Sequence, residues 1–401
     1  MNKRVYLDNN ATTPLHPEVQ KIMTDNIDIF GNASSFHESG RRARSLIEKS
    51  RETISSYLGC SPLEIIFTAG GSESNNTALN TINCCNAACA AECKRRVITT
   101  SIEHPSVLNA CMYFKKIGRE VSFLPVDEYG IVRTADLEKE ISPGLVSIMY
   151  ANNEVGSIQP IKKLAEIAHK HKAVFHTDAV QAVGKLPFKI VDIDADMLSL
   201  SGHKLHGPKG IGVLYIKKGI HFCPLIIGGH HERNRRAGTE NNLAIIGLGK
   251  AFEMLEKEFE EENEKLLRLK NKLRDGILES IPEVKLNGHE TECLPGTLNI
   301  SFKYIEGESI LLMLDMEGIE VSTGSACASG SLDPSHVLLA MGLDPHFAHG
   351  SIRFSLGRDN TEADIDYVLL KLPAIVSKLR KMSPLYKGPV SARAVETGKS
   401  R

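Results

Sequence analysis

Two charged side chains near the middle of the chain have the chemistry of a cofactor site. Asp178 ends the strand-like run VFHTD, and Lys204 follows a second such run within Ser-Gly-His-Lys. The carboxyl ends of strands in an α/β protein lie at the edge of the sheet that holds ligands. Pyridoxal phosphate needs this pair, because its aldehyde forms a Schiff base with a lysine and its pyridine nitrogen pairs with a carboxylate. Either residue alone would more simply be a surface charge. The glycines that constrain the backbone around the lysine are Gly202, Gly207, Gly210 and Gly212.

A glycine-rich turn offers a place for the phosphate of such a cofactor. The segment EIIFTAGGSESNNTAL reads as a strand, a Gly-Gly-Ser turn and a helix. The first N–H groups of a helix, together with the positive end of its dipole, bind anions. Such a turn alone is a weak signal, but beside a Schiff-base lysine it becomes the expected phosphate cradle, with Gly71 and Ser72 as donors.

The composition indicates a soluble enzyme. The chain has 401 residues, and its 48 basic and 49 acidic side chains leave no charge excess that would favour a nucleic acid or an anionic membrane as partner. No apolar run is long enough for a membrane span, and the N-terminus lacks the apolar region of a signal peptide. Nine cysteines, an odd number spread irregularly, favour reduced thiols and a cytoplasmic location.

The order of the expected elements predicts an α/β protein of two domains. Strand-like runs alternate with helical patterns through residues 15–255, which indicates a large domain built on a mostly parallel sheet with helices on both faces. A long or broken amphipathic helix is expected over 248–281, with its charged residues on a solvated face. Residues 1–14 with 256–384 read as a smaller α+β domain. The polar segment 385–401 is expected to be a disordered tail.

A cysteine cluster lies outside the expected site. Cys85, Cys89 and Cys93 recur every four residues, with Cys84 beside them, and would share one helical face. A single metal ion is a poor explanation, because thiols at this spacing extend along about 12 Å of helix and no histidine is near. Small thiols on an alanine-rich helix are the simpler interpretation.

Several longer motifs resemble those of one family. They run in order from residue 5 to about residue 384, and they are similar to those of the pyridoxal-phosphate cysteine desulfurases, most of all the nitrogenase-associated (NifS-type) branch of the class V aminotransferase family. The resemblance implies the aminotransferase type of fold (PLP fold type I), a small domain that carries a mobile cysteine loop, and a homodimer. The motifs are YLDNNATTP, GGSESNN, EHPSV, ANNEVG, HTDAVQAVGK, SGHKLHGPKG, RRAGTEN, STGSACASGSLDPSHVL and SIRFSLGR.

The same resemblance implies roles at the cofactor ring. Lys204 matches the Schiff-base lysine, and Asp178 matches the carboxylate that keeps the pyridine nitrogen protonated. Gln181 and Asn153 match the groups that bond the phenolic oxygen of the ring. His104 matches the imidazole that stacks on the ring and moves protons. A histidine in Glu-His-Pro would by itself more often be a loop residue.

Phosphate and substrate contacts follow from the resemblance as well. Thr239, in RRAGTEN, matches a phosphate donor that reaches across from the partner subunit. Arg353, with Asn153 beside it, matches the group that binds the substrate carboxylate through two parallel hydrogen bonds. The remaining matches to phosphate contacts are Gly71, Ser72, Ser201 and His203.

Cys327 differs from the other thiols in its surroundings. Its neighbours are small, which favours a mobile loop. A small buried cysteine is the alternative. The thiolate is the reactive form, and a sulfur carrier must visit the cofactor before it meets another protein. Cys327 matches the family's persulfide-forming residue, which could also ligate an iron–sulfur cluster transiently.

These matches predict a cysteine desulfurase that converts L-cysteine to L-alanine and supplies sulfur to an iron–sulfur scaffold or another acceptor protein, with nitrogenase clusters as the expected destination. A selenocysteine lyase or an aminotransferase on the same scaffold would keep Lys204 and Asp178 without requiring the Cys327 loop. A non-catalytic docking protein is a third interpretation, which the set Lys204, Asp178, His104 and Cys327 disfavours.

Overall fold

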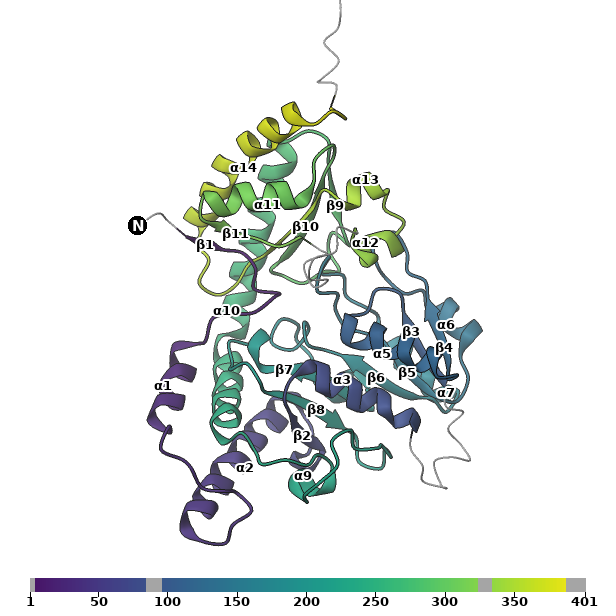
Figure 1. Cartoon of the computed structure of the whole chain (residues 1–401), viewed down its shortest axis with the longest axis vertical. Coiled ribbons are helices and arrows are strands. Elements are labelled where there is room, and N and C mark those ends of the chain that lie inside the picture. The colour runs from purple at the N-terminus through teal and green to yellow at the C-terminus, as the bar shows by residue number, and fades with distance from the viewer. Residues whose placement is uncertain (1–3, 84–95, 324–333, 387–401) are drawn as a thin grey trace, which may run out of the picture.

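A computed structural model describes residues 4–83, 96–323 and 334–386. The expected cysteine cluster, the Cys327 loop and most of the expected tail lie outside these residues. The described chain forms two bodies, one around a large sheet and one around a small sheet, and a single long helix runs through both (Figure 1). None of the described helices is long and apolar enough to cross a membrane.

The larger sheet confirms the predicted, mostly parallel α/β arrangement. Four neighbouring strand pairs are parallel, and only β8 runs antiparallel to the strand on either side of it. In spatial order its strands are β2 (Ile65–Thr68), β8 (Gly212–Ile216), β7 (Met197–Ser201), β6 (Val174–Asp178), β5 (Leu145–Ser147), β3 (Arg96–Thr100) and β4 (Glu120–Leu124).

Both faces of this sheet are buried. Along β8, Val213 belongs to one apolar cluster and Leu214 to another, because alternate side chains of a strand point to opposite faces. A sheet covered on both sides explains why β8 has the apolar run Val-Leu-Tyr-Ile and is buried along its whole length. The helices of this body are α1 (Pro17–Asp25), α2 (Glu38–Leu58), α3 (Gly71–Leu79), α5 (Pro105–Lys116), α6 (Thr134–Glu140), α7 (Ile161–Lys170), α8 (Ile190–Ile193) and α9 (His231–Asn234), with 3-10 turns η1 (Pro62–Glu64), η2 (Asn80–Asn83) and η3 (Gly202–Lys204).

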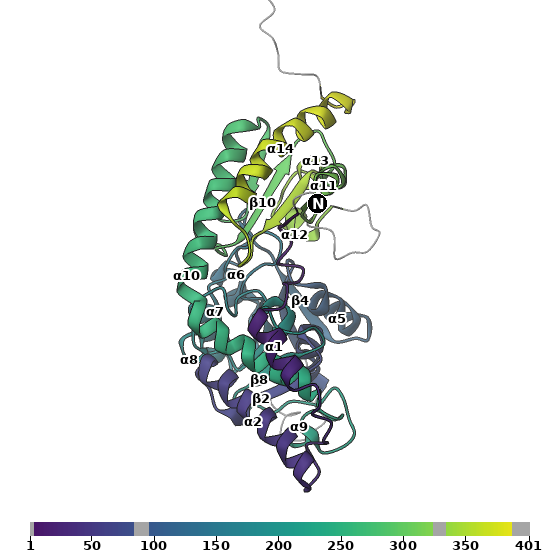
Figure 2. The same cartoon turned by 90° about the vertical axis from the view of Figure 1, so that its left-hand side faces the viewer.

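The long helix α10 (Asn242–Ser280) is continuous over 39 residues. It begins before the predicted position because the Asn241 side chain accepts a hydrogen bond from the Ala244 N–H and caps it. Its first part contributes Phe252 to the core of the large sheet, and its last part contributes Leu273 to the core of the small one. Figure 2 shows this helix extending along both bodies.

The second body has its own apolar core, which includes Val5 and Leu7 from the start of the chain. Its antiparallel sheet has the order β12 (Ser351–Ser355), β10 (Thr297–Phe302) and β9 (Val284–Asn287), and β1 (Val5–Tyr6) pairs in parallel with β11 (Ile319–Glu320). We propose the domain boundaries stated above on the strength of these two cores. The helices of this body are α11 (Gly307–Met316), α12 (His336–Ala340), α13 (Pro345–Ala348) and α14 (Glu362–Met382).

Candidate active site

A cavity of about 290 Å³ lies at the carboxyl ends of β6 and β7. It is enclosed by residues from both bodies, since Asn10 and Arg353 reach it from the second one. The predicted residues that line it are Gly71, Ser72, His104, Asn153, Asp178, Gln181, Ser201, His203, Lys204 and Arg353.

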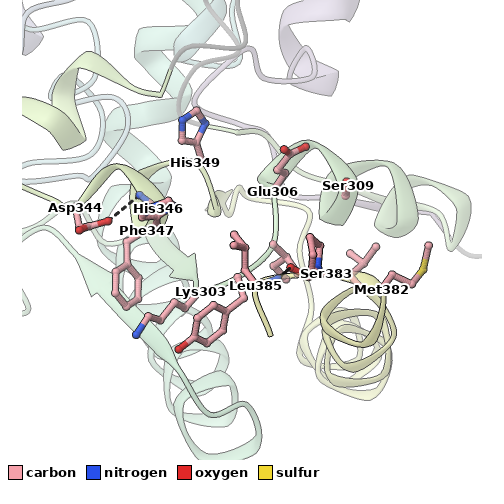
Figure 3. Close-up of a pocket in the computed structure, with 14 residues that line it drawn as sticks. Lys303, Glu306, Ser309, Asp344, His346, Phe347, His349, Met382, Ser383 and Leu385 are labelled. Carbon is pink, nitrogen blue, oxygen red and sulfur yellow. Dashed lines mark hydrogen bonds between the residues drawn. The ribbon is translucent and has the colours of Figure 1, made fainter. Parts of the chain in front are cut away.

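A larger cavity of about 740 Å³ lies elsewhere on the second body (Figure 3). It is bounded by the aromatic rings of Tyr304 and Phe347 and by the end of α14 around Met382. None of the described residues that were predicted to do chemistry lines it. Asp344 accepts a hydrogen bond from the His346 N–H there, which caps α13 and needs no ligand. Volume alone therefore does not identify the functional site.

Asp178 is held by two hydrogen bonds that aim its carboxylate into the smaller cavity. Its Oδ2 accepts from Asn75 Nδ2 at 2.7 Å, and its Oδ1 accepts from the Val180 N–H at 3.0 Å. The Asn75 Nδ2 group also donates to Ser106 Oγ at 2.9 Å. The two hydrogen bonds to Asp178 fix the orientation of the carboxylate in a residue that is only 5% exposed.

The amino end of α3 is left open toward the cavity. Gly70 precedes the helix with φ of 152°, and no side chain caps the first N–H groups. A Cβ on Gly71 would lie 2.8 Å from Val180 Cγ2, so only glycine lets the start of α3 lie this close to Val180. Ser72 and Ser201 line the same part of the cavity. These are the donors that an anionic phosphate requires at a helix terminus.

His104 is fixed by its place at the start of α5. Its Nδ1 accepts a hydrogen bond from the Ser106 N–H at 3.1 Å and lies 2.8 Å from Ser106 Oγ. Burial lowers the pKa of His104 below its usual value, and the charge of Lys204 adds to this effect, while Asp178 opposes it. The ring is therefore neutral at pH 7 and can face an aromatic cofactor without adding charge.

Lys204 enters the cavity from η3, directly after β7. Its Nζ donates to the Ala11 carbonyl at 2.7 Å and also contacts the Asn10 carbonyl. Next to it, His203 has a pKa lowered to about 4, mainly by burial and also by the charges of Lys204 and Lys209. Two backbone carbonyl oxygens near the start of the chain thus help to hold the amine in the cavity.

Arg353 approaches from β12 with its guanidinium group nearly enclosed. Its Nη1 donates to the Asn153 carbonyl at 3.1 Å, and its Nη2 pairs with Asp8 Oδ1 at 2.7 Å. Its Nε is buried and has no hydrogen-bond partner among the described residues. A guanidinium with an unused donor is suited to a further anionic ligand such as a carboxylate.

These groups fit pyridoxal phosphate. The cavity combines an amine, a buried carboxylate on the neighbouring strand and an uncapped helix start, which match the aldehyde, the ring nitrogen and the phosphate of that cofactor. The buried Asn75 Oδ1, which has no partner within the described chain, adds an unused acceptor.

Four contributors to this site were not predicted: Asp8, Asn10, Asn75 and Ser106. All four lie inside motifs that were recognised, namely YLDNNATTP, GGSESNN and EHPSV. The amide of Asn75, one helical turn beyond Gly71, could have been recognised as a hydrogen-bond donor to Asp178.

Two predicted residues are not among those that the structure shows lining the cavity. Thr239 is exposed and does not line it, so its proposed contact depends on a second subunit. Cys327 lies outside the described residues. Within the described part of the chain, no group of three or more His, Cys, Asp or Glu side chains could hold a metal ion.

The fold and the cavity define a pyridoxal-phosphate enzyme of the aminotransferase type. The family model for aminotransferase class V matches residues 5–368, and the chain belongs to that family.

Individual relatives narrow the comparison further. The "Cysteine desulfurase IscS" of Methanosarcina thermophila is 50% identical over 390 residues, which cover 96% of this chain and 95% of that protein. A solved "NifS-like protein" has 40% identity and a TM-score of 0.87, covering 94% of this chain and all of the other. The structure "SspA in complex with cysteine" has 35% identity and a TM-score of 0.77, covering 88% and 99%.

Proposed function

We propose that the protein is a cysteine desulfurase that releases alanine from L-cysteine and keeps the sulfur on Cys327. The observation that carries this proposal is the cavity that brings Lys204, Asp178 and Arg353 together from two separate sheets. The relatives described above support the choice of substrate, since one is named a cysteine desulfurase and another is solved with cysteine.

The positions of the residues support the roles proposed for them. Pyridoxal phosphate, when bound, supplies an aldehyde for an amine and a protonated ring that withdraws electrons. Asp178 holds the proton on the ring nitrogen, and Arg353 binds the substrate carboxylate. Lys204 removes the proton from the substrate Cα, which its approach from η3 into the cavity permits. Neutral His104 covers the ring and can accept a proton near the substrate sulfur.

Sulfur transfer balances with one thiol of the enzyme. The bond between the substrate Cβ and its sulfur breaks, and a bond between that sulfur and Cys327 Sγ forms. The carbon skeleton leaves as alanine, so that L-cysteine and the enzyme thiol become alanine and an enzyme persulfide. No external oxidant or reductant is consumed.

We also propose that the active form is a homodimer. Exposed apolar side chains gather on the loop 26–37, where Phe30 is 86% and Phe36 is 92% exposed. This loop adjoins the segment that carries Thr239, because Asn242 Nδ2 donates to the Gly31 carbonyl. A second copy on this face would cover the apolar side chains and bring Thr239 to the partner's phosphate.

The sulfur is proposed to supply iron–sulfur cluster assembly in the cytoplasm, through a protein acceptor. Nitrogenase clusters are the narrower destination that the sequence motifs favour. The names of the relatives reported above do not specify nitrogenase, so this narrower proposal depends on the motifs alone.

The proposal is tested by incubating the purified protein with L-cysteine, with and without a keto acid, and measuring alanine and protein mass. We expect alanine without the keto acid and one added sulfur atom on the peptide that contains Cys327. The Cys327→Ser variant should show neither. Consumption of the keto acid would indicate an aminotransferase instead, and normal alanine release by Cys327→Ser would exclude the sulfur-transfer step.

A further inference from the structure

A second lysine lies directly behind the wall of the active-site cavity. Lys185 follows Gln181 by four positions in the turn after β6 and is not itself a lining residue. Its Nζ donates to Gln181 Oε1 at 2.6 Å and to Asn10 Oδ1 at 3.0 Å. Both of these amide residues line the cavity. Lys185 therefore contacts the cavity only indirectly, through these two lining residues.

In its protonated form, which predominates below pH 7, Lys185 determines which way two amides face. A lysine ammonium has three donors and no acceptor, so it can contact only the oxygen end of an amide. The nitrogen of Gln181 must then face away from Lys185, and it donates to the Asn10 carbonyl at 2.9 Å. In the same way, Asn10 Nδ2 donates to the Asn153 carbonyl at 3.1 Å and to Thr297 Oγ1 at 2.9 Å.

The same network reaches the reactive amine. The Asn10 carbonyl that accepts from Gln181 Nε2 also contacts Lys204 Nζ. Lys185 also responds to the charges of the site. Burial and the positive charges of Lys204 and Arg353 lower the pKa of Lys185 to about 7, while the charge of Glu262 opposes this shift. Lys185 thus lies close enough to the site for its charge to be felt there.

We propose that Lys185 is a positioning residue, which orients the Gln181 amide so that this side chain presents N–H groups and no oxygen to the cofactor. The proposal deepens the function proposed above, because it assumes that Gln181 bonds the phenolic oxygen of the cofactor ring. An N–H donor there favours the ionised oxygen, whereas a rotated amide would place two oxygen atoms against each other. The pH at which the visible spectrum of the bound cofactor changes should therefore depend on Lys185.

Three variants of the holoenzyme test this role. Lys185→Met keeps an unbranched side chain but removes every donor, and Lys185→Arg keeps a cation that can only donate. Lys189→Met is the matched control, because that exposed lysine donates to the Tyr57 carbonyl and lies away from the cavity. For each protein, the visible absorbance is titrated with pH, and the dissociation constant of pyridoxal phosphate and the melting temperature of the cofactor-free form are measured.

We expect Lys185→Met to move the spectral midpoint by about one pH unit and to weaken cofactor binding roughly tenfold. Each of these effects corresponds to the loss of one hydrogen bond to a charged group. Lys185→Arg and Lys189→Met should stay close to the wild type. An unchanged midpoint in folded Lys185→Met would overturn the proposal, even if its melting temperature fell. Should that variant not fold, the milder Lys185→Gln is judged by the same midpoint. Failure of the proposed function is distinguishable, because the wild type itself would then show no absorbance from lysine-bound cofactor.

Discussion

Arg353 is paired on two sides before any substrate arrives. Its contacts with Asp8 and the Asn153 carbonyl fix the plane of the guanidinium, and its unused Nε remains a donor. A planar fork held in this way can recognise a carboxylate by geometry as well as by charge. Arg353 and Lys204 line one cavity, which fits the proposed substrate with an amine and a carboxylate on the same carbon.

The first prediction concerns this fork. Arg353→Lys keeps the charge but loses the two parallel donors, so we expect kcat/KM for L-cysteine to fall roughly 10- to 100-fold, with most of the change in KM. Steady-state alanine production measures both constants. Arg358→Lys is the control, since that side chain pairs with neighbouring Asp359 and is not among the residues that line the cavity. An unchanged KM for Arg353→Lys would show that the substrate carboxylate is bound elsewhere.

A second prediction follows from Glu103, a fully buried carboxyl group next to the site. Burial raises its pKa from 4.5 to about 8, although hydrogen bonds from the Met149 N–H and Thr100 Oγ1 oppose the shift. The folded protein thus keeps a proton that the unfolded chain loses above pH 4.5. This contribution to stability is present at low pH and is lost as the pH rises toward 8.

We therefore expect the free energy of unfolding of the wild type to fall by about 4 kcal/mol more between pH 5 and 9 than that of Glu103→Gln, whose side chain stays neutral. Urea unfolding at several pH values gives both curves. Parallel curves for the two proteins would mean that Glu103 does not hold its proton in the folded state.

At the scale of elements, α10 contributes side chains to both cores and packs very closely against α2 at one position. A Cβ on Gly249 would lie 2.7 Å from the Cβ of Ser50 and 2.9 Å from its Cα, so α10 and α2 meet where neither helix has room for another atom. Gly249→Val should lower the free energy of unfolding by about 1–3 kcal/mol through overpacking. Lys257→Val places the same side chain at an exposed position of α10 and controls for helix propensity. Equal losses in the two variants would contradict the close contact.

The elements also show how far the sequence could predict the molecule. Asp178 and Lys204 could be placed together because strand ends of a parallel sheet share one edge. The continuity of α10 could not be predicted, since periodicity does not reveal whether each half of a helix finds its own core. Asn75 and Asn10 were missed because their partners, Asp178 and Lys185, are more than 100 residues away in sequence. The roles of Thr239 and Cys327 stay predictions.

At the scale of the whole molecule, the site exists only where both bodies meet. Asp8, Asn10 and Arg353 come from the second body, while Asp178 and Lys204 come from the first. Because α10 contributes side chains to both cores, the two halves of the cavity are held by one rigid helix. The proposed dimer would complete the phosphate end of this cavity.

The dimer itself is testable. Phe36→Asp places a charge on the most exposed ring of the loop 26–37 and should convert the protein to a monomer with much weaker cofactor binding, since the Thr239 of a partner is then lost. Light scattering and cofactor titration measure these effects. Leu370→Asp, at a side chain 71% exposed on α14, should change neither. A Phe36→Asp protein that stays dimeric would rule out this face as the interface.

The central claim is that Lys204 carries the cofactor. Borohydride reduction of the active holoenzyme makes a lysine–cofactor bond permanent, and peptide mapping then locates it. We predict a pyridoxyl group on the peptide containing Lys204, and none in a Lys204→Ala protein treated in the same way. An active protein with Lys204 unmodified, or with the label on neighbouring Lys185, would contradict the account.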